Sequence, residues 1–414
     1  MSLINRGPSR TFAALRVRNF RLYFVGQLIS VSGTWMQSLA QGWLVLQMTG
    51  SALDLGAAVA LQYVPMLLFG TFGGLVADRH QKRRILYFTQ SSAGLLALLL
   101  GVLVSTHHVD VYGVYVIAFG LGIVNLFDVP ARQAFVQEMV GRDLIANAVS
   151  LNSVLMNSGR LIGPGVAAGV IALVGTAACF YLNAASFVAV LIALLMMNRE
   201  AFLPMATVER EKGQLRLGLH YAFSTPLLRN VIIAVAMAGT FAYNFTVTLP
   251  LLATKTFHET TATHYGLLMG AMGLGAVIGG LVVARRSRPT PRMLAVLMLG
   301  FGLGMALAAL APTVTLAEIA MIPVGACSIA VIATANSLLQ LNSIEDMRGR
   351  VMSLYSIAFL GTTPIGAPLI GLVVAASNPR VGIFVGAAVL LATGAGLLLQ
   401  QRQAVRRAKV LRVA

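Results

Sequence analysis

The sequence predicts an all-α integral membrane protein with twelve transmembrane helices in two pseudo-symmetric six-helix bundles. Hydrophobic residues make up 57% of the 414 residues and charged residues only 10%, against about 25% in an ordinary soluble domain. Apolar runs recur that are long enough to cross a bilayer, and basic residues concentrate in every second loop between them. A β-barrel is excluded because the runs are long and do not alternate with a period of two.

Cutting the chain at charged residues, prolines and turn residues leaves twelve apolar segments. Each is close to or longer than the ~20 residues that a helix needs to cross the hydrocarbon. In chain order the expected spans are 20–46, 54–77, 85–105, 110–128, 145–174, 176–198, 230–254, 263–284, 292–312, 314–338, 350–376 and 381–400.

The loops between these spans differ sharply in charge. The first span follows a basic N-terminus, and the basic runs 79–84, 199–229 and 285–292 separate later pairs of spans on the same side. The opposite loops hold only Lys255 and Arg380 of the 30 Lys and Arg residues. Because basic loops stay in the cytoplasm, we expect both termini and the middle loop to be cytoplasmic. The charge forms no single patch, which disfavours nucleic acid as a partner.

The two halves of the sequence resemble each other weakly. Gly-Gly-Leu-Val ends the second span at 73–76 and the eighth at 279–282, and each copy is followed by Arg-rich sequence. We expect an N-terminal six-helix bundle over 1–198, a cytoplasmic linker over 199–229 and a C-terminal bundle with a basic tail over 230–414. Two such halves are suited to alternating access around a central path.

The stretch from Gly74 to Arg84 reads Gly-Leu-Val-Ala-Asp-Arg-His-Gln-Lys-Arg-Arg. It resembles the signature of the major facilitator superfamily between spans two and three, except that Gln81 stands where the family prefers glycine. The matching residues are Gly74, Asp78, Arg79, Lys82, Arg83 and Arg84. The resemblance implies the major facilitator fold and a gating latch at Asp78. The alternative is that the basic residues only determine topology.

Further stretches at 127–135, 147–153, 159–164 and 348–353 look like the subgroup that contains enterobactin exporters and bacterial drug efflux proteins. This resemblance implies a secondary transporter that exports small amphipathic molecules, drugs or siderophore-like compounds, across the bacterial inner membrane by proton antiport. An importer, or a lipid or lysolipid flippase of the same fold, remains an alternative.

Two features depart from the proton-coupled members of that family. The stretch 117–124 in span four carries no charge, whereas many of those members have an arginine there. The helix-break pattern of span five is partial, because Gly159, Gly163 and Pro164 fit but Ala167 replaces a glycine. Both departures weaken the case for proton antiport and leave the fold prediction intact.

Polar residues repeat on single helix faces, which cannot face lipid cheaply. Arg160 is the only base clearly inside the membrane, and Asp128 is its nearest acid by topology, so we expect the two to pair. Such a pair either docks spans four and five or forms a site for an anion or a proton. Polar stripes also serve simply to join helices. The candidates for the substrate or proton pathway are Gln37, Gln41, Asn125, Asp128, Asn157, Arg160, Tyr243 and Asn244.

We expect neither a metal nor an organic cofactor. His107, His108 and Asp110 share one short loop without a fuller ligand set, and no Gly-Lys-Ser/Thr phosphate loop is present. The proton gradient is therefore the expected energy source. A membrane-embedded enzyme is a distant alternative, because the few acids are spread singly. The expected partners are a small-molecule substrate, protons and membrane lipid, and we expect a monomer.

Overall fold

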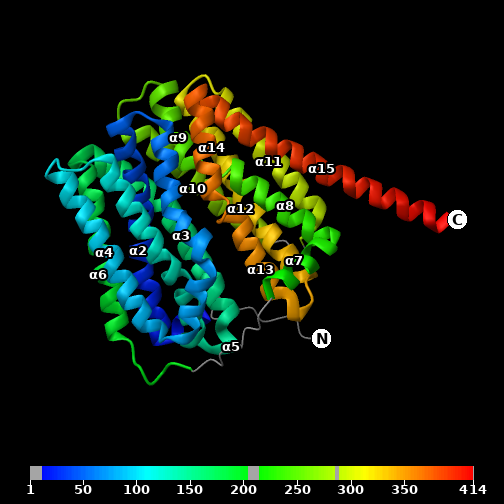
Figure 1. Ribbon diagram of the computed structural model, residues 1–414, viewed down its shortest axis with the longest axis horizontal. Coiled ribbons are helices and arrows are strands. Elements are labelled where there is room, and N and C mark those ends of the chain that lie inside the picture. The colour runs from blue at the N-terminus through cyan, green and yellow to red at the C-terminus, as the bar shows by residue number, and fades with distance from the viewer. Residues whose placement is uncertain (1–11, 204–213, 285–288, 414) are drawn as a thin grey trace. The chain divides into compact units, whose positions relative to one another are not determined.

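The computed structural model describes residues 12–203, 214–284 and 289–413, and every regular element in those ranges is a helix (Figure 1). In chain order the elements are η1 (Ala13–Arg16), α2 (Arg18–Thr49), α3 (Ala52–Arg79), α4 (Lys82–Ser105), α5 (Val111–Val174), α6 (Thr176–Met196), α7 (Gln214–Ser224), α8 (Pro226–Phe241), α9 (Phe245–Leu251), η2 (Leu252–Thr256), α10 (Ala262–Ala284), α11 (Pro291–Leu310), α12 (Val314–Asn342), α13 (Glu345–Phe359), α14 (Thr363–Ala376) and α15 (Pro379–Val413).

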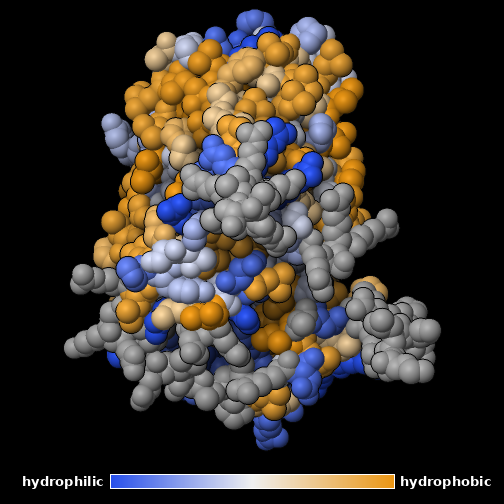
Figure 2. Space-filling model, turned by 90° about the vertical axis from the view of Figure 1, so that its right-hand side faces the viewer, coloured by the Kyte–Doolittle hydropathy of each residue, from blue (hydrophilic) through white to orange (hydrophobic). Residues whose placement is uncertain are grey.

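In the described ranges, eleven helical stretches are long and apolar enough to cross a membrane, and they coincide with expected spans two to twelve. The first expected span, 20–46, is also helical, within α2. It is absent from the eleven because glutamine, serine and threonine interrupt its apolar residues. The all-helical membrane fold is thus confirmed. Figure 2 shows hydrophobic residues over much of one face, as a surface in contact with lipid requires.

The helix breaks lie elsewhere than the sequence predicts. Spans four and five form one element, α5, whose single non-helical residue is Gly141 (φ 69°, ψ −178°). A side chain at that positive φ would be strained, and its Cβ would also meet Leu203, so glycine suits the position. At Gly159, Gly163 and Pro164, which carry the partial helix-break pattern, α5 continues as a helix.

Spans seven and eleven, which the sequence predicts to be continuous, are each interrupted. In span seven α8 ends at Phe241 and α9 begins at Phe245, so Tyr243 and Asn244 lie in the gap. In span eleven α13 ends at Phe359 and α14 begins at Thr363. Discontinuous helices expose backbone groups at membrane depth, and proteins tolerate them where those groups find partners or line a site.

The chain forms two compact units. Unit 1 comprises Met1–Leu44 and Val64–Glu209, and unit 2 comprises Val45–Tyr63 and Arg210–Ala414. In unit 1, α4 packs against α5 and α6, and a core of Phe20, Tyr23, Phe135 and other apolar residues fills one end. In unit 2, α11 packs in the same way against α12 and α15.

Close helix crossings recur inside the two units. In unit 1 a Cβ on Gly163 would lie 2.5 Å from the Cβ of Trp35 and 2.7 Å from the carbonyl oxygen of Ser32, so α5 contacts α2 backbone to backbone. In unit 2 a Cβ on Gly366 would collide with the carbonyl oxygen of Thr240. The weak repeat in the sequence therefore corresponds to the same kind of crossing in each half.

The crossing of α2 with α5 leads to a first prediction. Gly163→Ala should lower thermal stability, because the methyl group must push two backbones apart, at a cost of about 1–3 kcal/mol. The matched control is Gly165→Ala, two residues along the same helix, where an added Cβ meets nothing within 4 Å. Melting of both purified variants in detergent measures the difference, and equal melting temperatures would contradict the close crossing.

Candidate functional site

Asp128 is the centre of a buried polar network in unit 1. Its side chain lies on α5 and the residue is only 3% exposed. One carboxylate oxygen accepts hydrogen bonds from Thr89 Oγ1 (2.8 Å) and Gln90 Nε2 (2.7 Å) of α4. The other accepts from Arg132, through Nε at 2.9 Å and also through Nη2. Four donors from two helices therefore surround the carboxylate, which is how a charge is held away from water.

Arg132 extends this network to a third helix. Its Nη1 donates to Gln27 Oε1 of α2, and Gln27 is 1% exposed. The ion pair with Asp128 spans one helical turn, at an i,i+4 spacing. Thus α2, α4 and α5 are joined at one level by a single group of polar side chains.

The expected pairing of Asp128 with Arg160 is replaced by this pair with Arg132. Arg160 instead places its guanidinium carbon 5.3 Å from the centre of the Trp35 ring of α2. A cation over the face of an indole is attracted by the ring quadrupole, more strongly where water is excluded. Because Gly159 and Gly163 bring α2 and α5 together on either side, Arg160 lies at the closest part of this crossing.

The basic residues of the superfamily signature make specific contacts. Lys82 Nζ lies 3.2 Å from Glu138 Oε1 of α5, and both side chains are mostly buried. Arg83 donates through Nη2 to the carbonyl oxygen of Leu194 near the C-terminal end of α6 and to Tyr87 Oη at 3.1 Å. A cation at the carbonyl end of a helix also complements the helix dipole. These two residues thus tie the start of α4 to both neighbouring helices.

The other signature residues lie around the loop between α3 and α4. Gly74 and Asp78 are half-buried near the end of α3, whereas Arg79 and Arg84 are exposed. The gating role expected for Asp78 stays a prediction, since it concerns a movement rather than one arrangement.

The polar stripe of α2 serves different neighbours along its length. Gln37, 4% exposed, accepts a hydrogen bond from Asn183 Nδ2 of α6 at 2.5 Å. It therefore joins two helices, as one of the alternatives predicted. Gln41 is buried, and Asn125 of α5 is exposed. Asn157 lies on α5, but its side chain is outside the described part of the structure.

In unit 2, Tyr243 and Asn244 lie in the interruption of span seven beside a group of aromatic rings. The Tyr243 ring centre is 5.0 Å from that of Phe359, at the end of α13, and 5.4 Å from that of Phe301 on α11. Tyr243 Oη donates to the carbonyl oxygen of Ser328 on α12 at 2.7 Å. The interruptions of spans seven and eleven therefore meet at one aromatic cluster, made of Tyr243, Phe245, Phe301, Tyr355 and Phe359.

Asn244 has an unusual environment for an amide. It is 4% exposed, and its Nδ2 donates to the carbonyl oxygen of Thr240 at 2.7 Å. Its Oδ1 is buried and has no hydrogen-bond partner among the described residues. A buried acceptor left in this way costs about 1–3 kcal/mol unless a ligand or water fills it.

A histidine between two carboxylates lies at the start of α10 in unit 2. His264 Nδ1 is 2.8 Å from Glu318 Oε1 of α12, and its Nε2 is 3.6 Å from Glu259 Oε2. The carboxylates approach opposite ring nitrogens and so do not converge on one point. Consistently, no group of three such residues in the described ranges could hold a metal ion.

Sequence reasoning missed Thr89, Gln90, Glu138 and His264. Thr89 and Gln90 begin a short polar run, Thr-Gln-Ser-Ser, in α4, and nothing in their spacing indicates which helix they face. One signal was available for Arg132, because Asp128 and Arg132 have the i,i+4 spacing of a helical ion pair. The charge-based division into loops instead placed Arg132 outside span four.

The network around Asp128 leads to a second prediction. Asp128→Asn should strongly destabilise the protein, by about 3–5 kcal/mol, because the buried Arg132 cation loses its counter-ion. Arg132→Gln should also destabilise it, and the double variant should be more stable than the sum of the single effects. Melting in detergent measures this coupling, with the exposed Arg84→Gln as control. Additive effects would contradict a shared network.

A family model described as transmembrane secretion effector matches residues 9–411. The multidrug efflux pump Tap of Mycolicibacterium fortuitum is 26% identical over 361 residues, which cover 84% of this chain and 88% of that pump. The enterobactin exporter EntS of Salmonella choleraesuis is 27% identical over 385 residues, covering 92% of this chain and 91% of that exporter.

Among solved structures, a POT family transporter in complex with a thioalcohol-conjugated peptide matches with a TM-score of 0.75 and 11% identity. The match covers 93% of this chain and 96% of that one, and it supports the fold alone. Since the family model spans nearly the whole chain, the protein belongs to the transmembrane secretion effector family of the major facilitator superfamily and is a transporter, not an enzyme.

Proposed function

We propose that this protein exports small amphipathic molecules, drugs or siderophore-like compounds, across the bacterial inner membrane by proton antiport and alternating access. It would work as a monomer. Both termini would lie in the cytoplasm, as the distribution of basic loops favours. The names of the relatives described above, a multidrug efflux pump and an enterobactin exporter, support small-molecule export.

The observation that carries the substrate class is the interruption of span seven. There Asn244, whose Oδ1 has no hydrogen-bond partner among the described residues, directly follows Tyr243, whose ring belongs to the aromatic cluster. Aromatic faces offer a large apolar surface, and a single amide oxygen beside them can orient a donor group of the ligand. Such a surface suits a flat molecule that is mostly apolar and has at least one hydrogen-bond donor.

The driving force requires a side chain that gains and loses a proton. An imidazole ring can take up and release a proton, and His264 lies between two carboxylates. By the charge distribution, the end of unit 2 that carries His264 is the extracellular one. We therefore propose His264 with Glu318 as the point at which protons enter.

Asp128 has a different role in this proposal. All its described contacts are with donors that hold the carboxylate in place, and Arg132 compensates its charge. We assign it to the rigid framework of unit 1, with Lys82 and Arg83 fixing the adjoining loop. The latch at Asp78 would then move relative to a fixed base.

The third prediction concerns Asn244. Asn244→Leu should raise the substrate concentration for half-maximal export about tenfold, as expected for one lost hydrogen bond to the substrate. Stability should change little, since the loss of the Nδ2 hydrogen bond to Thr240 is offset by removal of a buried acceptor that has no partner in the described structure. Export is measured as reduced accumulation of fluorescent drugs and siderophores in cells, against an empty vector and with or without a protonophore.

Phe88→Ala is the control for that series, because Phe88 is 72% exposed on α4 and lies apart from the aromatic cluster. Export by wild type that persists with the protonophore would contradict proton coupling. Accumulation equal to the empty vector for every compound would contradict export of this class. Faster lipid movement in liposomes would then favour a flippase.

The fourth prediction concerns His264. His264→Gln should flatten the dependence of export on external pH, since glutamine cannot take up a proton. The comparison variant is His108→Gln, an exposed histidine of unit 1. Export by proteoliposomes under imposed pH gradients measures both variants. A His264→Gln profile that follows wild type would exclude this histidine as the entry point.

A further inference from the structure

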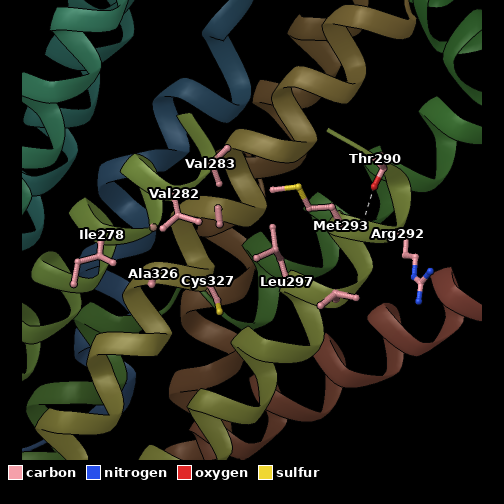
Figure 3. A pocket seen from close by; sticks show the side chains of 12 residues that line it. Ile278, Val282, Val283, Thr290, Arg292, Met293, Leu297, Ala326 and Cys327 are labelled. Carbon is pink, nitrogen blue, oxygen red and sulfur yellow. Dashed lines mark hydrogen bonds between the residues drawn. The ribbon is translucent and has the colours of Figure 1, made fainter. Parts of the chain in front are cut away.

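Unit 2 contains a cavity that none of the contacts above uses. It has a volume of about 480 Å³ and lies between α10, α11 and α12 (Figure 3). This volume falls within the roughly 300–1,000 Å³ of typical small-molecule sites. Small residues explain why the space exists. Gly279 of α10 contacts the backbone at Ala326 of α12, so these two helices meet closely, whereas α11 packs against α12 and leaves space beside α10.

This cavity is a groove, because it is open to the outside of the bundle, and its walls are apolar. Ile278 and Val282 of α10 and Val296 of α11 line it, and they are 45%, 51% and 52% exposed. These three positions lie on helices long enough to cross the membrane, and exposed apolar side chains at that depth are suited to contact with hydrocarbon. A ligand of this groove would then come from the lipid phase.

One end of the groove is polar and positive. Figure 3 shows Thr290 and Arg292 at one end of the lining and Ile278 toward the other. Among the described lining residues Arg292 is the only charged one. It is exposed and has no ion pair or hydrogen bond within the described structure. Thr290 Oγ1 accepts a hydrogen bond from Met293 N at 3.1 Å, so its hydroxyl proton can still be donated outward.

These properties describe a ligand with an anionic group at one end and an apolar chain at the other. We propose that the groove binds one anionic phospholipid of the surrounding membrane. Its phosphate pairs with Arg292 and Thr290, and an acyl chain lies along Ile278, Val282 and Val296. Arginine matches phosphate geometry with two parallel hydrogen bonds, and basic pockets between membrane helices are suited to lipid headgroups. The bound lipid would fill the space between α10 and α11.

Cys327 provides a native reporter for this site. The chain has two cysteines; Cys327 is half-buried in the groove lining, and Cys179 is fully buried in unit 1. A lipid in the groove should shield Cys327 from N-ethylmaleimide. Shielding is measured on the full-length, delipidated protein in detergent, with phosphatidylglycerol and phosphatidylcholine of identical acyl chains. Native mass spectrometry of the same samples counts the lipids retained.

We expect phosphatidylglycerol to shield Cys327 at about fivefold lower concentration than phosphatidylcholine, the effect expected of one basic residue near an anionic lipid. Arg292→Gln should abolish that preference, and Val282→Trp should abolish shielding by both lipids. Arg229→Gln is the matched control, an exposed arginine in the first turn of α8 that also follows a helix-initiating proline. It should behave as wild type.

Four results would overturn the proposal. One is equal shielding by the two lipids in wild type, which indicates non-specific annular lipid. Another is an unchanged lipid preference in Arg292→Gln. The third is equal protection by inorganic phosphate alone, which would make the site an anion site without a role for the acyl chain. Protection by an exported drug and by neither lipid would equally refute it.

Discussion

The buried carboxylate of Asp128 is the interaction on which unit 1 depends. A charge at this depth is tolerated only because Thr89, Gln90 and Arg132 supply all its donors, and each of them must be delivered by a helix held in one register. Arg132 in turn reaches Gln27, so α2 is positioned by the same group. Lys82 with Glu138 repeats the link between α4 and α5 further along. The hydrophobic contacts around Phe135 fill the space that these polar contacts define.

Unit 2 has the same kind of close helix crossings but no equivalent charge. At the offset that relates Gly163 to Gly366, the position of Asp128 is occupied by Val331, which is buried and apolar. Unit 2 instead has two interrupted spans whose ends meet at Tyr243 and Phe359. The repeat therefore preserves backbone packing while the side chains have diverged. One half holds its helices by charge, and the other has a largely buried aromatic cluster and a buried amide oxygen without a partner among the described residues.

The fold could be predicted from sequence because hydropathy and loop charge act residue by residue. The number and order of the spans needed no tertiary information, and the superfamily signature lies where the span count places it. The network at Asp128 could not be predicted, since the rotation of α4 about its axis decides whether Thr89 and Gln90 face Asp128. The interruption at Tyr243 and Asn244 was hidden for a similar reason, because the sequence there contains no proline or glycine and tertiary packing determines the break.

Gly141 has a mechanical consequence for the protein. Two complete spans are joined through one residue in a left-handed conformation, without an intervening loop. The junction has no loop residues that could absorb a movement. A tilt of span four is therefore transmitted to span five through the two backbone dihedral angles of Gly141. The two spans would then move together about Gly141. An added or deleted residue there would rotate one span about its own helix axis. Length variation in this protein should therefore be confined to its other connections.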